Sequence, residues 1–313
     1  MKNNELISVV IPVFNEEKSL KILYEQLQIS LKQYPDYEII FVDDGSSDNS
    51  FSVIEKIAQN DKNIIGIRLL KNFGKSDALN VGFKYSTGNI VITMDADLQD
   101  DPLEIRKLVE KIRDGWDLVS GWKKNRKDPF SKKFPSMIFN YITRLLTGVA
   151  IHDFNCGLKA YKRIVVETID IYGGMHRYIP VLANYKGFSV SEVIVNHRSR
   201  EYGLSKYGIK RFLHGFFDIF TVLFLGKYVY RPLHFFGFIG LSFIISGIII
   251  CSYLTIGWFQ GIWIGNRPIL FLGMLLIIMG VQIFSIGLLA ELFIKNSIVS
   301  IKKIRSVTRL NPS

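Results

Sequence analysis

The chain has 313 residues, of which 48% are hydrophobic and 21% charged, and its formal net charge is +11. Its mean hydropathy of +0.20 is high for a soluble protein of this length, so we expect part of the chain to lie in lipid. The excess of Lys and Arg indicates an anionic partner, while two distant cysteines, Cys156 and Cys251, exclude a disulfide framework and a cysteine-rich zinc site.

Short apolar segments alternate with segments of helical period over the first part of the chain. We expect strands at 8–14, 38–44, 64–70, 89–97 and 117–122, and helices at 19–34, 48–60, 75–86 and 101–115. Ser47 or Asp48 is placed to cap the second of these helices. The alternation predicts an α/β domain with a mostly parallel sheet, whose ligands bind beyond the carboxyl ends of the strands.

Carboxylates follow several of these strands, and the pair Asp95 and Asp97 closes a wholly apolar one. Two carboxylates at this spacing can share a divalent cation, to which Gln99 could add a neutral oxygen. Such hard oxygen ligands favour Mg²⁺ or Mn²⁺ over zinc. An acidic pair can also do no more than cap a helix, so the pair by itself leaves both interpretations open.

Two nucleotide-binding motifs are excluded. No G-x-G-x-x-G follows the first strand, as a dinucleotide site would require. Gly74-Lys75-Ser76 imitates the end of a P-loop, but Leu69 stands where that loop needs its first glycine.

Two apolar segments near the C-terminus, with Glu291 near the end of the second, are each long enough to cross a bilayer as a helix. They lie near 233–256 and 268–292, with Trp258 and Trp263 between or beside them at the level that headgroups would occupy. Small residues within them would allow close helix packing: Gly237, Gly240, Gly247, Gly273, Gly280 and Gly287.

Basic residues flank both outer ends of the two spans, whereas only Arg267 lies in the connection. Since positive charge stays inside, we expect an integral multi-pass plasma (inner) membrane protein with both termini and the α/β domain in the cytoplasm. Residues 210–231 read as amphipathic helices in the membrane interface, or as a packing helix of the globular domain. The basic tail indicates a membrane surface; no nucleic-acid motif is present, so nucleic acid is not expected. The expected divisions are 1–208, 209–231, 232–294 and 295–313.

Four segments together carry a resemblance to a known family: VIPVFNE (10–16), VDDGSSD (42–48), NFGK (72–75) with ALN (78–80), and MDADLQDDP (94–102). They resemble glycosyltransferase family 2, which has a GT-A (Rossmann-like) fold. Within it they are similar to the polyprenyl-phosphate glycosyltransferases, the dolichol-phosphate mannose synthases and bactoprenol-phosphate glucosyltransferases. Bacterial members of that group also carry two C-terminal membrane helices, so the resemblance covers nearly the whole chain.

The resemblance implies a role for each matching position. Those on the donor side bind the nucleoside and diphosphate, with a basic pair closing from a mobile loop: Pro12, Glu16, Asp43, Asp44, Lys75, Asp95, Arg200 and Lys206. The metal would be held by Asp95, Asp97 and Gln99, and the acceptor phosphate by Lys123, Lys132 and Ser136. The mannose synthases have arginine where this chain has these lysines, and the basic run at 123–133 also fits a solvated, lipid-facing loop. Asp153 falls near the reacting centre, as a base, as a residue that orients the acceptor, or as a structural cap.

The implied reaction is an inverting, Mg²⁺- or Mn²⁺-dependent transfer of a sugar from a nucleotide sugar, with UDP-glucose expected, to polyprenyl (undecaprenyl) phosphate in the lipid bilayer. A homo-oligomer is expected. A processive polysaccharide synthase is the first alternative, although the chain lacks the Q-x-x-R-W motif of those enzymes. A sugar nucleotidyltransferase would have no reason for two spans, and intact acidic and basic motifs argue against a non-catalytic membrane scaffold.

Overall fold

The computed structural model describes residues 5–124, 130–198, 218–219, 221–224, 231–263 and 268–296, except the side chains of 130–135 and 294–296. The chain divides into two compact units, Met1–Val222 and Leu223–Ser313. The expected domain divisions stay predictions. Most of the expected interfacial segment 210–231 and the whole tail beyond residue 296 lie outside the described residues.

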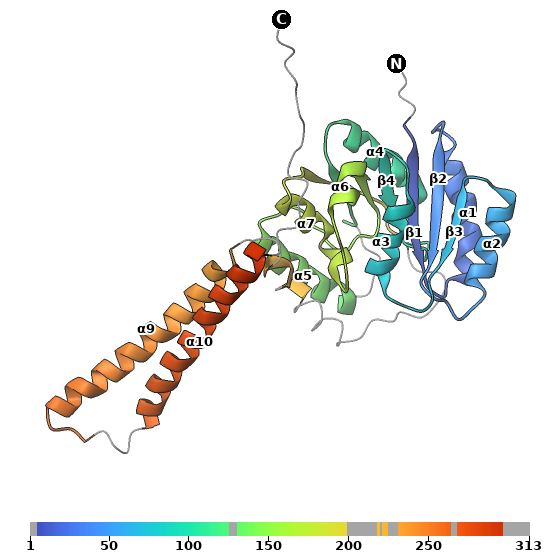
Figure 1. Ribbon diagram of the computed structural model, residues 1–313. Coiled ribbons are helices and arrows are strands. Elements are labelled where there is room, and N and C mark those ends of the chain that lie inside the picture. The colour runs from blue at the N-terminus through green and yellow to red at the C-terminus, as the bar shows by residue number, and fades with distance from the viewer. Residues whose placement is uncertain are drawn as a thin grey trace, which may run out of the picture. The chain divides into compact units, whose positions relative to one another are not determined.

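A seven-stranded sheet forms the centre of the first unit (Figure 1). Its order is β3-β2-β1-β4-β6-β5-β7, and β6 runs antiparallel to both neighbours while the other pairs are parallel. The strands are β1 (Ile7–Val13), β2 (Tyr37–Asp43), β3 (Ile64–Arg68), β4 (Ile90–Thr93), β5 (Leu118–Trp122), β6 (Lys159–Lys162) and β7 (Val190–Ile194). The mixed, mostly parallel sheet confirms the expected fold class.

Helices cover both faces of this sheet (Figure 1). On α1 (Glu17–Leu31) the leucines at positions 20, 23, 27 and 31 recur every three or four residues, and all pack in one buried cluster with Val9 and Ile11 of β1. On α3 (Lys75–Tyr85), Gly82 lies against Val10, and a Cβ atom at this position would overlap Val10 Cγ1. Because successive side chains of a strand point to opposite faces, α1 and α3 lie on opposite sides of β1.

The remaining helices of this unit differ in how well the sequence predicts them. α2 (Ser50–Asn60) and α4 (Ile105–Arg113), which follows the 3₁₀ turn Pro102–Glu104, lie where expected. The predicted cap, Ser47 or Asp48, is wrong: Asn49 is the N-cap residue of α2 and makes no capping hydrogen bond with its side chain, although Asp48 Oδ1 accepts a hydrogen bond from the Ser50 amide. α5 (Phe130–Thr147), α6 (Arg163–Thr168), the 3₁₀ turn Met175–Arg177 and α7 (Ile179–Tyr185) have no counterpart among the expected helices.

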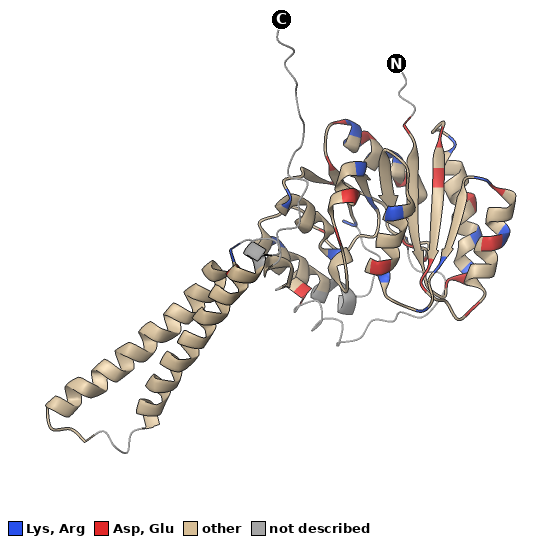
Figure 2. Ribbon diagram, in the orientation of Figure 1, with Lys and Arg blue, Asp and Glu red and all other residues tan. Residues whose placement is uncertain are grey.

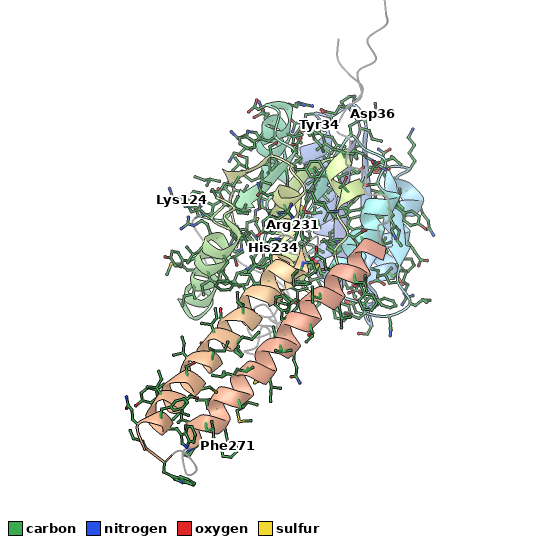
Figure 3. All side chains as sticks on the ribbon, turned by 60° about the vertical axis from the view of Figure 1, so that its left-hand side comes forward. Tyr34, Asp36, Lys124, Arg231, His234 and Phe271 are labelled. Atoms are coloured by element: carbon green, nitrogen blue, oxygen red, sulfur yellow. The ribbon has the colours of Figure 1, made fainter. Side chains whose placement is uncertain are left out.

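The second unit contains two long apolar helices, α9 (Pro232–Phe259) and α10 (Pro268–Asn296). Both are long and apolar enough to cross a membrane. Figure 2 shows that most of their length carries no charged residue, and Figure 3 places Phe271 at the opposite end of the hairpin from His234.

Glycines bring α9 and α10 into contact. A Cβ atom on Gly240 would lie 2.7 Å from the Gly280 carbonyl oxygen, and one on Gly247 would lie 2.6 Å from that of Gly273. The close helix packing expected from these small residues is confirmed, within the hairpin of one chain. The expected homo-oligomer stays a prediction.

Candidate active site

The loops that follow β1 and β2 are joined by side-chain hydrogen bonds. The Asn15 amide donates to Ser46 Oγ at 2.9 Å, and Asn15 Oδ1 accepts from the Ser47 amide at 2.8 Å. The Glu16 amide donates to Ser50 Oγ at 2.9 Å, at the start of α2. Asn15 adopts a left-handed backbone with φ of 56°, which asparagine tolerates better than most residues. The loops after the adjacent parallel strands β1 and β2 are thus held together by hydrogen bonds.

Asp43 and Asp44 at the end of β2 hold neighbouring backbone in place. Asp43 is fully buried; it accepts from the Ser46 amide and lies 3.4 Å from Arg68 Nε. Asp44 accepts from the amides of Phe73 and Gly74 at 2.8 and 2.9 Å. Burial raises the pKa of Asp44, an effect that these two hydrogen bonds oppose. The two carboxylates therefore shape the loops before a donor arrives.

A pocket opens beside these carboxylates, lined by Gly45, Ser46, Arg68, Leu69 and Leu70. Arg68 is not predicted as a site residue from the sequence, because nothing in the strand pattern pairs it with Asp43. Pro12 lies on β1 opposite Val42 of β2, one residue before that carboxylate pair. The donor-side roles of Pro12, Glu16, Asp43 and Asp44 stay predictions.

Charged side chains gather after β4. Lys75, the first residue of α3, forms an ion pair with Asp95. Lys123, which follows β5, is 9% exposed and lies 2.7 Å from Asp100 Oδ1. The Asp95 amide lies 3.4 Å from Asp100 Oδ2. The site thus brings together three carboxylates, counting Asp97, and two ammonium groups.

The two carboxylates of the predicted metal pair have opposite electrostatic surroundings. Burial alone would raise the pKa of Asp95, but Lys75 and Lys123 together hold it well below its usual range. Burial and the nearby charges of Asp95 and Asp100 raise the pKa of Asp97 to about 6. Among the described residues, no cation near Asp97 offsets the effect of its burial and of the neighbouring carboxylates on its pKa.

Lys123 differs from what its place in a basic run suggests. Its pKa is raised although burial alone would lower it, because Asp100 stabilises the ammonium. The adjacent Lys124 is exposed, with its ammonium 5.4 Å from the centre of the Trp122 ring. Lys123 therefore belongs to the acidic cluster rather than to an open basic rim. An acceptor contact from it stays a prediction, and would require the ammonium to serve both Asp100 and a phosphate.

The loop from Asp153 to Gly157 closes over Asp95. A Cβ atom on Gly157 would lie 2.6 Å from the Asp95 carboxylate, and the Gly157 carbonyl accepts from Thr93 Oγ1 at 2.9 Å. The buried Lys159 ammonium donates to the carbonyls of Phe154 and Cys156, and burial lowers its pKa. Asp153 is buried, and its Oδ1 accepts from the Asn155 amide at 3.1 Å. Lys159, whose ammonium binds two carbonyls of this loop, is not predicted as a site residue from the sequence.

Arg198 joins the end of the domain's last strand to the loop of the acidic pair. Its amide donates to the Gln99 carbonyl at 3.0 Å, and its guanidinium lies 2.8 Å from both Asp101 Oδ1 and Gln26 Oε1. Gln99 itself donates its amide to Asp97 Oδ1 at 3.2 Å. Arg198 is not predicted from the sequence either, since its partners Gln26, Gln99 and Asp101 are far away along the chain.

The structure does not test the roles of four predicted site residues. Arg200 and Lys206 lie outside the described residues, as does the side chain of Lys132. Ser136 lies on α5 and is half-buried. The roles predicted for these four residues stay predictions.

The donor set fits a hard divalent cation. Among the described residues no group of three His, Cys, Asp or Glu side chains forms a metal site by itself. Asp95 and Asp97 nevertheless offer two carboxylates, and the nearby charges of Asp95 and Asp100, which raise the pKa of Asp97, favour a cation beside it. Gln99 follows in the same loop, and oxygen donors of this kind suit Mg²⁺ or Mn²⁺.

Comparisons with known proteins agree with this arrangement. Residues 8–170 match the sequence profile of Glycosyl transferase family 2. A Rhizobium johnstonii protein named dodecaprenyl-phosphate galacturonate synthase is 39% identical over 293 residues, which cover 91% of this chain and 87% of that protein. A Pseudomonas fluorescens protein named undecaprenyl-phosphate 4-deoxy-4-formamido-L-arabinose transferase is 36% identical over 289 residues, 91% of this chain and 83% of its own.

A solved structure has the same fold. It is the Mycobacterium tuberculosis glucosyl-3-phosphoglycerate synthase in complex with Mn²⁺, UDP-glucose and phosphoglyceric acid. It is 18% identical, with a TM-score of 0.54 over 70% of this chain and 79% of that one. The chain belongs to glycosyl transferase family 2. It is a glycosyltransferase with a GT-A-like domain and two apolar C-terminal helices, which confirms the resemblance found in the sequence.

Proposed function

We propose that this glycosyltransferase moves a sugar from a nucleotide sugar to a membrane polyprenyl phosphate. The observation that carries the proposal is the carboxylate pair Asp95 and Asp97 at the end of β4, beside the ammonium groups of Lys75 and Lys123. Two relatives that match 91% of the chain are named for transfer to polyprenyl phosphates, and two membrane-length helices suit a lipid acceptor.

For this reaction the protein has mainly to position the two substrates and to stabilise their charges. An acceptor phosphate oxygen attacks the anomeric carbon in line, the bond from that carbon to the diphosphate breaks, and a nucleoside diphosphate leaves with inversion. A phosphate is already anionic near neutral pH, since its second pKa is about 6, so it needs little help from a base. Proximity and preorganised charge can then supply most of the rate enhancement.

Asp95, Asp97 and Gln99 would hold Mg²⁺ or Mn²⁺, which when bound neutralises the leaving diphosphate. Lys75, Arg200 and Lys206 are proposed to hold the donor diphosphate. Lys123, Lys132 and Ser136 are proposed to hold the acceptor phosphate. Asp153, buried in the loop that closes over Asp95, would orient the acceptor or take a proton from it.

The sugar is the finer part of the proposal. UDP-glucose is the prediction from the sequence, whereas the two relatives are named for galacturonate and 4-deoxy-4-formamido-L-arabinose. A panel of the three UDP-sugars, each radiolabelled, therefore tests the donor. UDP-glucose as the best donor would support the prediction; preference for either of the others would replace it.

The reaction is tested with membranes that contain the full chain, labelled nucleotide sugars and undecaprenyl phosphate. A labelled product that extracts into organic solvent supports the proposal. A labelled polymer would favour a processive synthase, and absence of transfer with every donor would favour a scaffold. Membranes that contain Asp97→Ala at equal abundance are the matched control.

A further inference from the structure

Four side chains form one row across the sheet, beneath the loop that closes over Asp95. Thr93 of β4 pairs with Lys159 of β6. Ser120 of β5 pairs with Lys159 on one side and with Glu192 of β7 on the other. Directly paired residues of neighbouring strands point to the same face of a sheet, so the four side chains lie on one face.

The 152–157 loop crosses this row, and the members of the row bind it in the order in which the strands lie. At the β4 end, Thr93 Oγ1 donates to the Gly157 carbonyl at 2.9 Å. Over β6, the Lys159 ammonium donates to the carbonyls of Phe154 and Cys156. Because these hydrogen bonds go to backbone carbonyls, they fix the path of the loop itself.

The other end of the loop is held over β5 and β7. Ser120 Oγ donates to the Asp153 carbonyl at 3.5 Å. Glu192 Oε2 accepts from the His152 amide at 2.7 Å, and Glu192 Oε1 pairs with His152 Nδ1. The His152 ring also stacks on the Trp122 ring, with 4.1 Å between the ring centres and 12° between the planes. Side chains of two strands thus hold His152, the neighbour of Asp153.

The end of the loop at β7 is the least buried part of this arrangement. β7 is the last strand in the order of the sheet. The side chains of His152 and Glu192 are 47% and 17% exposed, whereas the three inner members of the row are buried. Since local unfolding starts where few groups are buried, this end of the loop should open first. Glu192 is therefore the side chain on which the position of that end depends.

We propose that Glu192 and His152 are positioning residues, which hold Asp153 at the reacting centre by fixing the 152–157 loop over β7. With the loop already ordered, Asp153 can meet the acceptor without the entropy cost of ordering it during the reaction. The proposal rests on the proposed function through the role given there to Asp153. The order of the loop, however, can be measured without any sugar transfer.

Three variants separate the contacts of this pair. Glu192→Ala removes both acceptor oxygens. Glu192→Gln can still accept from the His152 amide and can donate to Nδ1, and His152→Asn places an amide nitrogen near the position of Nδ1. Glu38→Ala is the matched control, because Glu38 is also a half-buried carboxylate on a strand and accepts from the Thr87 amide at 2.6 Å. It lies at the opposite end of β2 from Asp43.

Hydrogen exchange of the full chain in detergent, read by mass spectrometry, measures the order of the loop. We expect Glu192→Ala to speed the exchange of residues 152–156 by about tenfold or more, because this end of the loop can then open. Glu192→Gln, His152→Asn and Glu38→Ala should exchange there at the natural rate. Peptides from β1 report whether each variant is folded, and Glu192→Asp, with its shorter reach, takes the place of a Glu192→Ala chain that is not. Unchanged exchange in the folded variant, or an equal rise in Glu38→Ala, would overturn the proposal.

Kinetics tests the connection to Asp153. Glu192→Ala should lower kcat by about ten- to a hundredfold and change the KM for the nucleotide sugar by less than about twofold, whereas Glu192→Gln and His152→Asn should resemble the natural chain. In an Asp153→Asn background, Glu192→Ala should lower kcat by less than about a further twofold, because the effects of residues that act through one another are not additive. Fully additive effects would overturn the positioning role.

Two other outcomes would overturn it as well. A loss of kcat in His152→Asn as large as that in Glu192→Ala would assign the effect to proton transfer at His152 Nε2. A loop that opens in Glu192→Ala without a change in kcat would mean that its order is irrelevant to the reaction. If the natural chain transfers no sugar, the proposed function fails by itself, while hydrogen exchange still decides whether Glu192 and His152 hold the loop.

Discussion

The surroundings of Asp97 disfavour its negative charge. Its pKa is raised to about 6 by burial and by Asp95 and Asp100, whereas Lys75 and Lys123 lower the pKa of Asp95. A carboxyl whose pKa is higher in the folded state than in the unfolded state binds its proton more tightly when folded. The free energy of unfolding therefore falls as pH rises from about 4 to above 6.

This charge predicts a stabilising substitution. In the presence of a chelator at pH 7.5, Asp97→Asn should raise the Tm of the full chain by about 2–4 °C, since it removes a half-buried charge next to Asp95 and Asp100. It should also flatten the decrease in Tm between pH 5 and pH 7. Thermal unfolding in detergent measures both effects, and Asp114→Asn at an exposed site is the control. An unchanged slope in Asp97→Asn would assign the pH dependence to another group.

The same residue predicts metal dependence. Chelation should abolish sugar transfer, Mn²⁺ or Mg²⁺ should restore it, and Asp97→Ala should lower kcat by about a hundredfold or more, because the leaving diphosphate then lacks a cation. Mn²⁺ should also raise the Tm of the natural chain and leave that of Asp97→Ala unchanged, since ligands stabilise the state that binds them. Full activity in excess chelator would refute the metal site.

At the scale of elements, Arg198 connects the segment after β7, the loop after β4 and α1. Arg198→Met removes the ion pair with Asp101 and the hydrogen bond to Gln26. We expect a several-fold rise in the Mn²⁺ concentration needed for half-maximal activity, because these two side-chain contacts fix the Arg198 backbone, whose amide donates to the Gln99 carbonyl. Metal titration of activity measures this, and Arg106→Met, which breaks an exposed ion pair with Glu110, is the control. Equal behaviour of the two variants would deny Arg198 a positioning role.

The hairpin of α9 and α10 depends on glycine at its contact. Gly240→Ala would place a Cβ atom 2.7 Å from the Gly280 carbonyl oxygen, which forces the helices apart. We expect a loss of about 1–3 kcal/mol, typical of overpacking. The free energy of unfolding in detergent is compared with that of Gly257→Ala, where the nearest atom to a Cβ lies 3.9 Å away. Similar losses in both variants would mean that helix propensity or lipid exposure, rather than the contact, governs the cost.

At the scale of the whole molecule, the distribution of basic residues predicts that both termini are cytoplasmic. A cysteine at Ile262, which is 44% exposed in the connection after α9, should be labelled from outside intact cells by an impermeant reagent. A terminal tag should become accessible only after lysis, and the Cys251→Ser background without added cysteine gives the control signal. Labelling of Ile262→Cys only after lysis, with a tag accessible from outside, would reverse the orientation.

Much of the fold follows from local pattern. The first five strands and the helices between them lie close to their predicted places, because buried parallel strands are short apolar runs that end at polar turn residues. The strand predicted at 89–97 ends earlier, at Thr93, since the segment that carries Asp95 and Asp97 leaves the sheet. The sequence pattern does not predict β6, which has the sequence KAYK. This segment forms a strand because it pairs with β4 and β5 on either side.

The sequence by itself determined the family, the order of the predicted strands and helices, the acidic pair and the two helices of membrane length. Each of these features depends on residues that are neighbours along the chain. Only the tertiary structure decided which lysines are buried. Lys123 pairs with Asp100, and Lys159 binds the carbonyls of the loop that closes over Asp95. A buried ammonium requires partners that fold around it, and those partners come from other loops. The sequence places Lys123 beside Lys124, but the fold separates them, one into the acidic cluster and the other onto the surface.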